Sequence, residues 1–230
     1  MRLNVYVAQQ TGLSRRSSDA LIASGKVRIN DAPAQLGAKL NEGDHVTIKQ
    51  SDSQNESVVS FGTPTHTTII MNKPTGYVCS RKGQGNRTVY DLLPDNLHNL
   101  KTVGRLDKDS SGLLVMTDDG QLNQTLTHPK HQKIKIYEIM LDKPLEPLHQ
   151  QMISDFGIQL DDGISQLQIG KIGDSAQHLR IIMSEGRNRQ IRRTFASLGY
   201  EVSKLHRTHF GDYRLGQLKS GKFHSVDVAE

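Results

Sequence analysis

Residues 101–129 read KTVGRLDKDSSGLLVMTDDGQLNQTLTHP, and this stretch indicates how the larger part of the chain folds. Its apolar run LLVMT, residues 113–117, predicts a buried strand. The Asp-Asp-Gly that follows predicts a turn and the cap of a short helix through Leu126. Asp107 stands just before the strand, after a Gly-Arg-Leu turn, where a carboxylate can be held rigidly. An aspartate in a polar loop is more often a turn or cap residue, so Asp107 needs support from the rest of the chain.

The next apolar segment, KIYEIML at residues 135–141, predicts another strand. Lys135 and Tyr137 are two residues apart, so they share one face of that strand. A charge beside an aromatic ring suits a nucleic acid, because a base that stacks on the ring gains about 1–3 kcal/mol. The alternative interpretation is that Tyr137 packs against a neighbouring strand.

A second supporting segment, SEGRNRQIRRTFASLGY at residues 184–200, predicts a helix that begins at Arg189 and ends at Leu198, before Gly199. On this helix Arg189 and Arg193 would share one face, and Arg192 would lie about 100° away, at the edge of the apolar side. A partly buried arginine is stable only with a carboxylate or phosphate partner. Asp107 is the candidate partner for Arg192.

The other segments after residue 65 alternate between short strands and a few helices. We expect strands at 67–72, 165–171, 178–184 and 200–205, and a helix at 147–156. Strands in mixed order with few helices are typical of an α+β domain built on a mixed, mostly antiparallel sheet.

The first 49 residues predict a small module of their own. Helices are expected at 3–10 and 14–24, followed by the strands KVRIN and HVTIK, residues 26–30 and 45–49. Four basic residues cluster around the second helix and the strand after it, and they can bind phosphates or form an ordinary solvated surface: Arg15, Arg16, Lys26 and Arg28.

Residues 50–65, QSDSQNESVVSFGTPT, are rich in Ser, Gln and Asn and predict an exposed linker between domains. The predicted organisation is therefore a module at 1–49, a linker at 50–65 and a second domain at 66–230.

Composition limits the class of protein. Lys and Arg total 29 against 24 for Asp and Glu, and the net charge of +5 favours a polyanionic partner. The single cysteine, Cys79, excludes an internal disulfide, and no apolar run reaches about 18 residues. We therefore expect a cytoplasmic protein with no membrane contact.

Four motifs of the chain resemble those of the RsuA and RluB type of pseudouridine synthase: GRLDKDSSGLL, EGRNRQIRR, IIMNKPTGYVCS and HRTHFGDYRLGQLKSG. This resemblance extends over the whole chain. It implies that Asp107 is the catalytic aspartate, Arg105 a residue of its motif, Tyr137 the stacking tyrosine and Arg192 the salt-bridge partner of Asp107.

The start of the chain resembles the S4 RNA-binding domain, on its SRR turn and on the segments SGKVRIN and GDHVTI. The resemblance covers residues 1–49 and implies that the four basic residues of this module face RNA. In the second domain we expect RNA contacts from Lys135, Arg187, Arg189 and Arg193.

The resemblance implies an rRNA pseudouridine synthase that isomerises one uridine in structured RNA. Large-subunit RNA is the slightly preferred target, with small-subunit RNA as the alternative. The reaction is redox-neutral, so we expect no cofactor and no metal, and we expect a monomer. Asp107 can act as a nucleophile or can remove a proton from the sugar to give a glycal, and the sequence does not choose between these routes.

Two other functions compete with this one. Asp107, Asp109, Asp118 and Asp119 could surround Mg²⁺ in a nuclease, although a strand separates the two pairs. Alternatively, the S4 module could serve a non-catalytic RNA-binding or ribosome-assembly protein.

Overall fold

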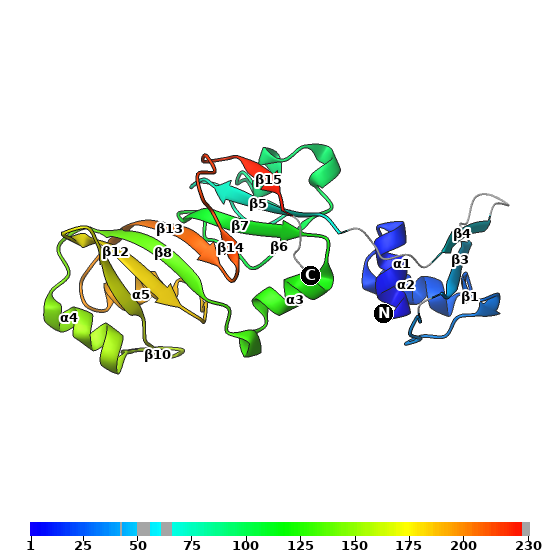
Figure 1. The fold of residues 1–230 in the computed structure, drawn as a ribbon, viewed down its shortest axis with the longest axis horizontal. Coiled ribbons are helices and arrows are strands. Elements are labelled where there is room, and N and C mark those ends of the chain that lie inside the picture. The colour runs from blue at the N-terminus through cyan, green and yellow to red at the C-terminus, as the bar shows by residue number, and fades with distance from the viewer. Residues whose placement is uncertain (42, 50–55, 61–65, 227–230) are drawn as a thin grey trace. The chain divides into compact units, whose positions relative to one another are not determined.

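A computed structural model describes residues 1–41, 43–49, 56–60 and 66–226 (Figure 1). The chain separates into two compact units, Met1–Thr65 and His66–Glu230, which are described one at a time.

The first unit packs two helices against a small antiparallel sheet. Helices α1 (Leu3–Thr11) and α2 (Arg15–Ala23) come first. The sheet has the order β2-β1-β3-β4, made of β1 (Val27–Ile29), β2 (Ala32–Pro33), β3 (His45–Lys49) and β4 (Glu56–Ser60). Ser14 caps α2 by accepting a hydrogen bond from the Ser17 N–H at 3.1 Å. Side chains from both helices and from β1 and β3 form one apolar core.

Part of the predicted linker forms a strand, at residues 56–60. These residues form β4, which pairs with β3 from His45↔Ser60 to Lys49↔Glu56. The edge of β3 offers unpaired backbone N–H and C=O groups, and the backbone of residues 56–60 pairs with them. The other residues of the predicted linker lie outside the described ranges.

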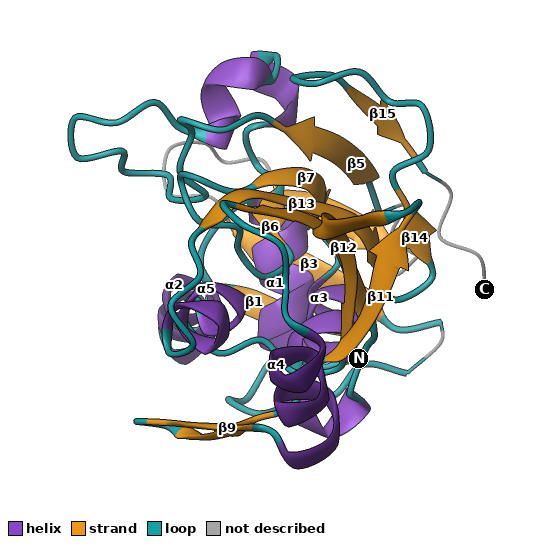
Figure 2. Cartoon of the chain, turned by 90° about the vertical axis from the view of Figure 1, so that its left-hand side faces the viewer, coloured by secondary structure: helices purple, strands orange, loops and turns teal. Residues whose placement is uncertain are grey.

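The second unit is built on a mixed nine-stranded sheet, which confirms the predicted α+β class. Figure 2 shows its strands side by side from β15 and β5 through β7 and β13 to β12. The full path is β11 (Gln168–Ile172), β12 (Ser175–Met183), β8 (Lys135–Leu141), β13 (Val202–Phe210), β7 (Ser111–Thr117), β5 (Thr68–Lys73) and β15 (Phe223–Ser225). Two short strands lie off this path, β14 (Tyr213–Arg214) on β13 and β6 (Lys101–Thr102) on β7.

One seam joins the two halves of this sheet. Strands β13 and β7 pair in parallel, with His206 opposite Ser111 and Arg207 opposite Gly112, whereas the other pairings between the described strands are antiparallel. Gly112 has φ +105°, and a Cβ there would lie 2.2 Å from the carbonyl oxygen of Arg207. Only glycine therefore permits the two backbones to approach so closely.

Strands β5 and β7 are buried on both faces, which explains their uninterrupted apolar sequences. Ile69 and Met116 belong to the larger core cluster, whereas Ile70 and Val115 belong to a separate cluster on the opposite face. Helix α5 (Gln190–Ala196) contributes apolar side chains to the first cluster, and α3 (Gly120–Thr127) contributes to the second.

A helix and a hairpin come between β8 and β11 in the chain. Helix α4 (Pro147–Gln151) continues as a π-helix over Met152–Phe156, and a separate hairpin consists of β9 (Ile158–Leu160) and β10 (Gly163–Ser165). Three short 3-10 helices occupy the loops, at Val89–Leu92, Asp95–Leu97 and Pro129–His131.

Candidate active site

A cavity of about 960 Å³ opens in the second unit between the loop before β7, strands β8 and β13, and the loop before α5. Six of the residues expected at the site line it: Arg105, Asp107, Lys135, Tyr137, Arg187 and Arg189. Arg192 and Arg193 are not part of its wall.

A buried lysine holds the backbone around Asp107. Lys73, at the end of β5, is 0% exposed, and its Nζ donates to three backbone carbonyls, including those of Asp107 at 3.0 Å and Ser110 at 2.7 Å. Burial lowers the pKa of this ammonium. On the other side, the Cys79 thiol both accepts from and donates to the Leu106 backbone at 3.4 Å. The loop that carries Asp107 is therefore fixed on two sides.

The Asp107 carboxylate itself is 36% exposed and contacts one arginine. Arg189 Nη1 lies 3.6 Å from Asp107 Oδ2. The same guanidinium donates to both oxygens of Asp109, at 3.1 and 2.9 Å. These hydrogen bonds lower the pKa of Asp109 below its usual value. Asp109 thus anchors Arg189 beside Asp107.

The predicted ion pair between Arg192 and Asp107 is wrong. Arg192 Nε lies 3.3 Å from Asp109 Oδ2, and its Nη2 donates to the Asp109 carbonyl oxygen at 3.1 Å. The reason is local: Arg189 has a left-handed backbone, φ +46°, so α5 begins one residue later than predicted and Arg189 does not follow the helical spacing. Arg189 reaches Asp107 instead, and Arg192 supports the loop two residues further on.

Lys135 and Tyr137 occupy the floor of the cavity on β8. Tyr137 is 8% exposed and lies between Ile181 on β12 and Arg207 on β13. The Lys135 ammonium donates to the carbonyl oxygens of Lys133 at 3.1 Å and Ser184 at 3.3 Å. One aromatic ring and one cation therefore face the same space, as expected for positions two residues apart on a strand.

Arg105 is exposed at the rim of the cavity. Within the described ranges of the chain, its guanidinium makes no hydrogen bond or ion pair, so its donors are free to receive a ligand.

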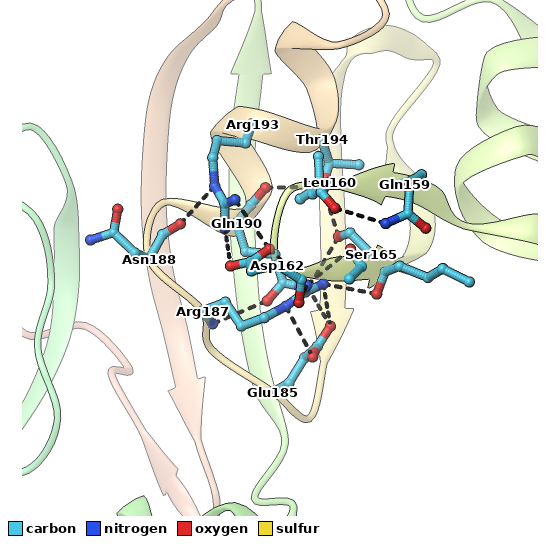
Figure 3. A network of polar contacts seen from close by, with 12 residues as sticks. Gln159, Leu160, Asp162, Ser165, Glu185, Arg187, Asn188, Gln190, Arg193 and Thr194 are labelled. Carbon is cyan, nitrogen blue, oxygen red and sulfur yellow. Dashed lines mark hydrogen bonds and ion pairs between the residues drawn. The ribbon is translucent and has the colours of Figure 1, made fainter.

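Arg187 and Arg193 are engaged inside the protein, as Figure 3 shows. Arg193 donates to both oxygens of Asp162 at 3.1 and 2.7 Å, and Arg187 donates to Asp162 Oδ1 at 2.8 Å. The side-chain amide of Gln190 adds a hydrogen bond to Ser165 Oγ at 3.0 Å. These contacts tie the β9–β10 hairpin to α5 and to the loop before it. The expected role of both arginines in RNA binding stays a prediction.

The basic residues of the first unit are placed as follows. Arg15 and Arg16 are exposed in the first turn of α2, and Lys26 is half-buried. Arg28 is also half-buried, and its Nε donates to the carbonyl oxygen of Asp31 at 2.8 Å. That these four side chains face RNA stays a prediction.

The aspartates of the competing nuclease interpretation do not converge. Asp118 accepts from the Thr67 N–H at 2.9 Å, and Asp119 caps α3 through the Gln121 N–H at 2.7 Å. In the part of the chain that the structure describes, no three His, Cys, Asp or Glu side chains are grouped to hold a metal ion. Among the same residues, no helix combines the length and apolar character needed to span a membrane.

Two of these features could not be found by the sequence reasoning. Lys73 lies in the motif IIMNKPTG, where the apolar run before it signals burial but not which groups its ammonium contacts. Arg207 was also missed, although it lines the cavity and is only 2% exposed.

Comparisons with known proteins give consistent matches. Residues 67–197 match the family described as RNA pseudouridylate synthase, and residues 1–46 match the S4 domain. The ribosomal small subunit pseudouridine synthase A of Yersinia pestis is 33% identical over 234 residues, which cover 100% of this chain and 96% of that protein. The ribosomal large subunit pseudouridine synthase B of Xanthomonas campestris pv. campestris is 34% identical over 240 residues, covering 100% of this chain.

The chain spans about half the length of two relatives it matches, 47% of the Xanthomonas campestris protein and 42% of a protein with the same description from Xanthomonas axonopodis pv. citri. Among solved structures, a crystal structure of a pseudouridylate synthase has a TM-score of 0.66 at 28% sequence identity, covering 99% of this chain and 96% of that one.

Proposed function

The chain belongs to the RNA pseudouridylate synthase family, and on this premise we propose that it isomerises a uridine of ribosomal RNA to pseudouridine with Asp107 as the catalytic carboxylate. The observation that carries the proposal is the cavity itself: it brings Asp107, Tyr137 and Arg189 together from three separate segments. The buried lysine that holds the backbone of the Asp107 loop supports the proposal.

The reaction needs a carboxylate but no external reductant or oxidant. The bond from N1 to C1′ breaks, the uracil turns, and C5 bonds to C1′ while C5 loses a proton and N1 gains one. Asp107 can attack as a nucleophile or remove a proton from the sugar, and both routes require a carboxylate held at a fixed position. Lys73 and Cys79 supply this position through the backbone, and Arg189 orients the side chain.

The uridine must leave its stack before it can reach Asp107. Unstacking costs a few kcal/mol, and stacking of the base on Tyr137 returns about 1–3 kcal/mol. The free guanidinium of Arg105 at the rim is suited to a phosphate of the same strand. We infer that the S4 module adds phosphate contacts elsewhere on the RNA.

The target subunit is a proposal of its own. Relatives described as acting on the large and the small subunit are 34% and 33% identical to the chain, so identity favours neither. We keep large-subunit RNA as the first target to test, because residues 72–94 resemble the RluB type more closely, and small-subunit RNA as the second. We expect a monomer that works in the cytoplasm, where ribosomal RNA is modified.

The proposal is tested with Asp107→Asn. Release of tritium from RNA that carries [5-³H]uridine measures loss of the C5 proton directly, and we expect this variant to release none while it binds the RNA within about threefold of the unmodified protein. Asp174→Asn, at an exposed turn away from the cavity, is the matched control and should be fully active. Appreciable turnover by Asp107→Asn would exclude Asp107 as the catalytic group.

Mapping of pseudouridines in ribosomal RNA from cells with and without the gene identifies the target. A single position in either subunit that loses its pseudouridine supports the proposed function. Unchanged maps of both subunits would contradict it.

A further inference from the structure

Two cations share one face of the sheet at the floor of the cavity. On β8 and β13, Lys135 is paired with Phe210 and Tyr137 with Arg207, so these four side chains form two adjacent cross-strand pairs. All four line the cavity. Arg207 Cζ lies 4.8 Å and Lys135 Nζ 5.3 Å from the centre of the Phe210 ring.

The guanidinium of Arg207 has more donors than the protein uses. Its Nε donates to the Leu113 carbonyl oxygen at 2.8 Å, which accounts for a structural role across the seam to β7. Its Nη2 is buried and has no hydrogen-bond partner, although the residue is only 2% exposed. Among the residues that the structure describes, no carboxylate forms an ion pair with it. A buried guanidinium in this state has lost water without gaining an anion.

Lys135 is in a similar position. Its ammonium donates only to backbone carbonyls, and burial, followed by the charge of Arg207, lowers its pKa. Glu185 is the carboxylate whose charge acts on it, but Glu185 is paired with Arg187 at 3.4 Å, as Figure 3 shows. Two nearby positive charges therefore repel each other, and an anion between them would relieve that repulsion. A neutral carbonyl of a base would not.

We propose that Lys135 and Arg207 form a phosphate subsite that receives a phosphate of the nucleotide whose base stacks on Tyr137. The assignment rests on the proposed function for the identity of that nucleotide. Position supports it: Tyr137 lies opposite Arg207, and Lys135 is two residues, about 7 Å, away along β8. Base and phosphate of one nucleotide can therefore reach the ring and the cations together. The subsite makes Arg207 a binding residue rather than a purely structural one.

The test compares uridine with uridine 5′-monophosphate and uridine 3′-monophosphate as ligands of the full chain, by ligand-observed NMR. We expect at least one monophosphate to bind about tenfold more tightly than uridine, as is typical of hydrogen bonds between charged groups. This gain should disappear in Lys135→Gln and in Arg207→Gln, and Arg207→Lys should restore part of it. The monophosphate that shows the gain identifies the side of the ribose that faces the cations.

Lys171→Gln removes a positive charge from an exposed position on β11 and is the matched control, in which the gain should stay. Because Arg207 is buried, its variants are first compared with the unmodified protein by circular dichroism, and Lys135→Gln alone decides the question if they do not fold. Equal binding of uridine and both monophosphates, or no binding of any, would overturn the proposal. A gain that survives in Lys135→Gln would also overturn it.

Failure of the subsite and failure of the proposed function have different signatures. If the protein releases tritium from RNA but binds the monophosphates no more tightly than uridine, the phosphate subsite is refuted and the proposed enzymatic activity stands. If a monophosphate binds more tightly than uridine in a way that depends on Lys135, but the protein modifies no RNA, the subsite stands and the proposed enzymatic activity is refuted.

Discussion

Lys73→Met removes the ammonium that holds the Asp107 loop while it keeps most of the side-chain volume. The substitution removes one donor from each of three backbone carbonyls, those of Pro74, Asp107 and Ser110. The Asp107 carbonyl keeps a second donor, the Ser110 N–H at 3.1 Å, so two acceptors are left unsatisfied. An unsatisfied buried acceptor costs about 1–3 kcal/mol, which gives roughly 2–6 kcal/mol for two. The variant also avoids part of the cost of burying an ammonium, so we expect a net loss of about 2 kcal/mol.

This loss can be measured by thermal unfolding of the full chain, followed by circular dichroism. For a unit of this size about 2 kcal/mol corresponds to a melting temperature about 4–8 °C lower. At a temperature where the variant is fully folded, we expect tritium release to fall about tenfold or more, because a displaced carboxylate loses its reactive geometry.

Lys171→Met, at an exposed position, controls for the loss of a positive charge and should change neither quantity. If Lys73→Met has the same melting temperature as the unmodified protein and releases tritium from RNA at the same rate, the buried lysine does not position the loop. A large loss of stability with full activity would assign Lys73 to the fold alone.

Three further outcomes follow from the site. Asp109→Asn should reduce turnover about tenfold, since Arg189 loses the partner that anchors it with a charged hydrogen bond, and single-turnover tritium release measures this; an unchanged rate would show that Asp109 positions nothing. Tyr137→Leu should weaken RNA binding about tenfold in a filter-binding assay while Tyr137→Phe keeps it, and equal affinity of both variants would exclude stacking. Arg193 lowers the pKa of Asp162, so the stability from this group is present above about pH 4 and lost as the pH falls through the lowered value. In Asp162→Asn the free energy of unfolding should accordingly fall less steeply at acid pH than in the unmodified protein. Identical curves for the two proteins would show that the ion pair of Asp162 with Arg193 adds no stability.

The sequence predicted the elements whose pattern is set by burial. Strands β5 and β7 are apolar throughout because both of their faces are covered, and α2 begins where Ser14 caps it. The family resemblance is confirmed by the matches to both domains. The two apolar strands and the helix cap depend on the residue types of short segments, which the sequence gives directly.

Features that depend on a single backbone angle or on a distant partner were not predictable. The left-handed conformation of Arg189 changes which arginine reaches Asp107, and the letters GRNRQIRR do not encode that angle. Strand β4 forms because β3 offers it an edge, although its segment is polar overall. Arg207 lies in a largely polar strand, and only the pairing of that strand with β8, opposite Tyr137, places it at the cavity floor.

The parallel pairing of β13 with β7 also determines when the site can form during synthesis of the chain. Asp107 precedes β7, whereas the wall with Arg207 belongs to β13, and the contact between Arg207 and Leu113 spans 94 residues of chain. Contacts so distant in sequence form late, because a long loop must close first. A chain still on the ribosome with Asp107 already emerged therefore has no cavity. Synthesis must therefore reach β13 before the cavity that the proposed function needs can form.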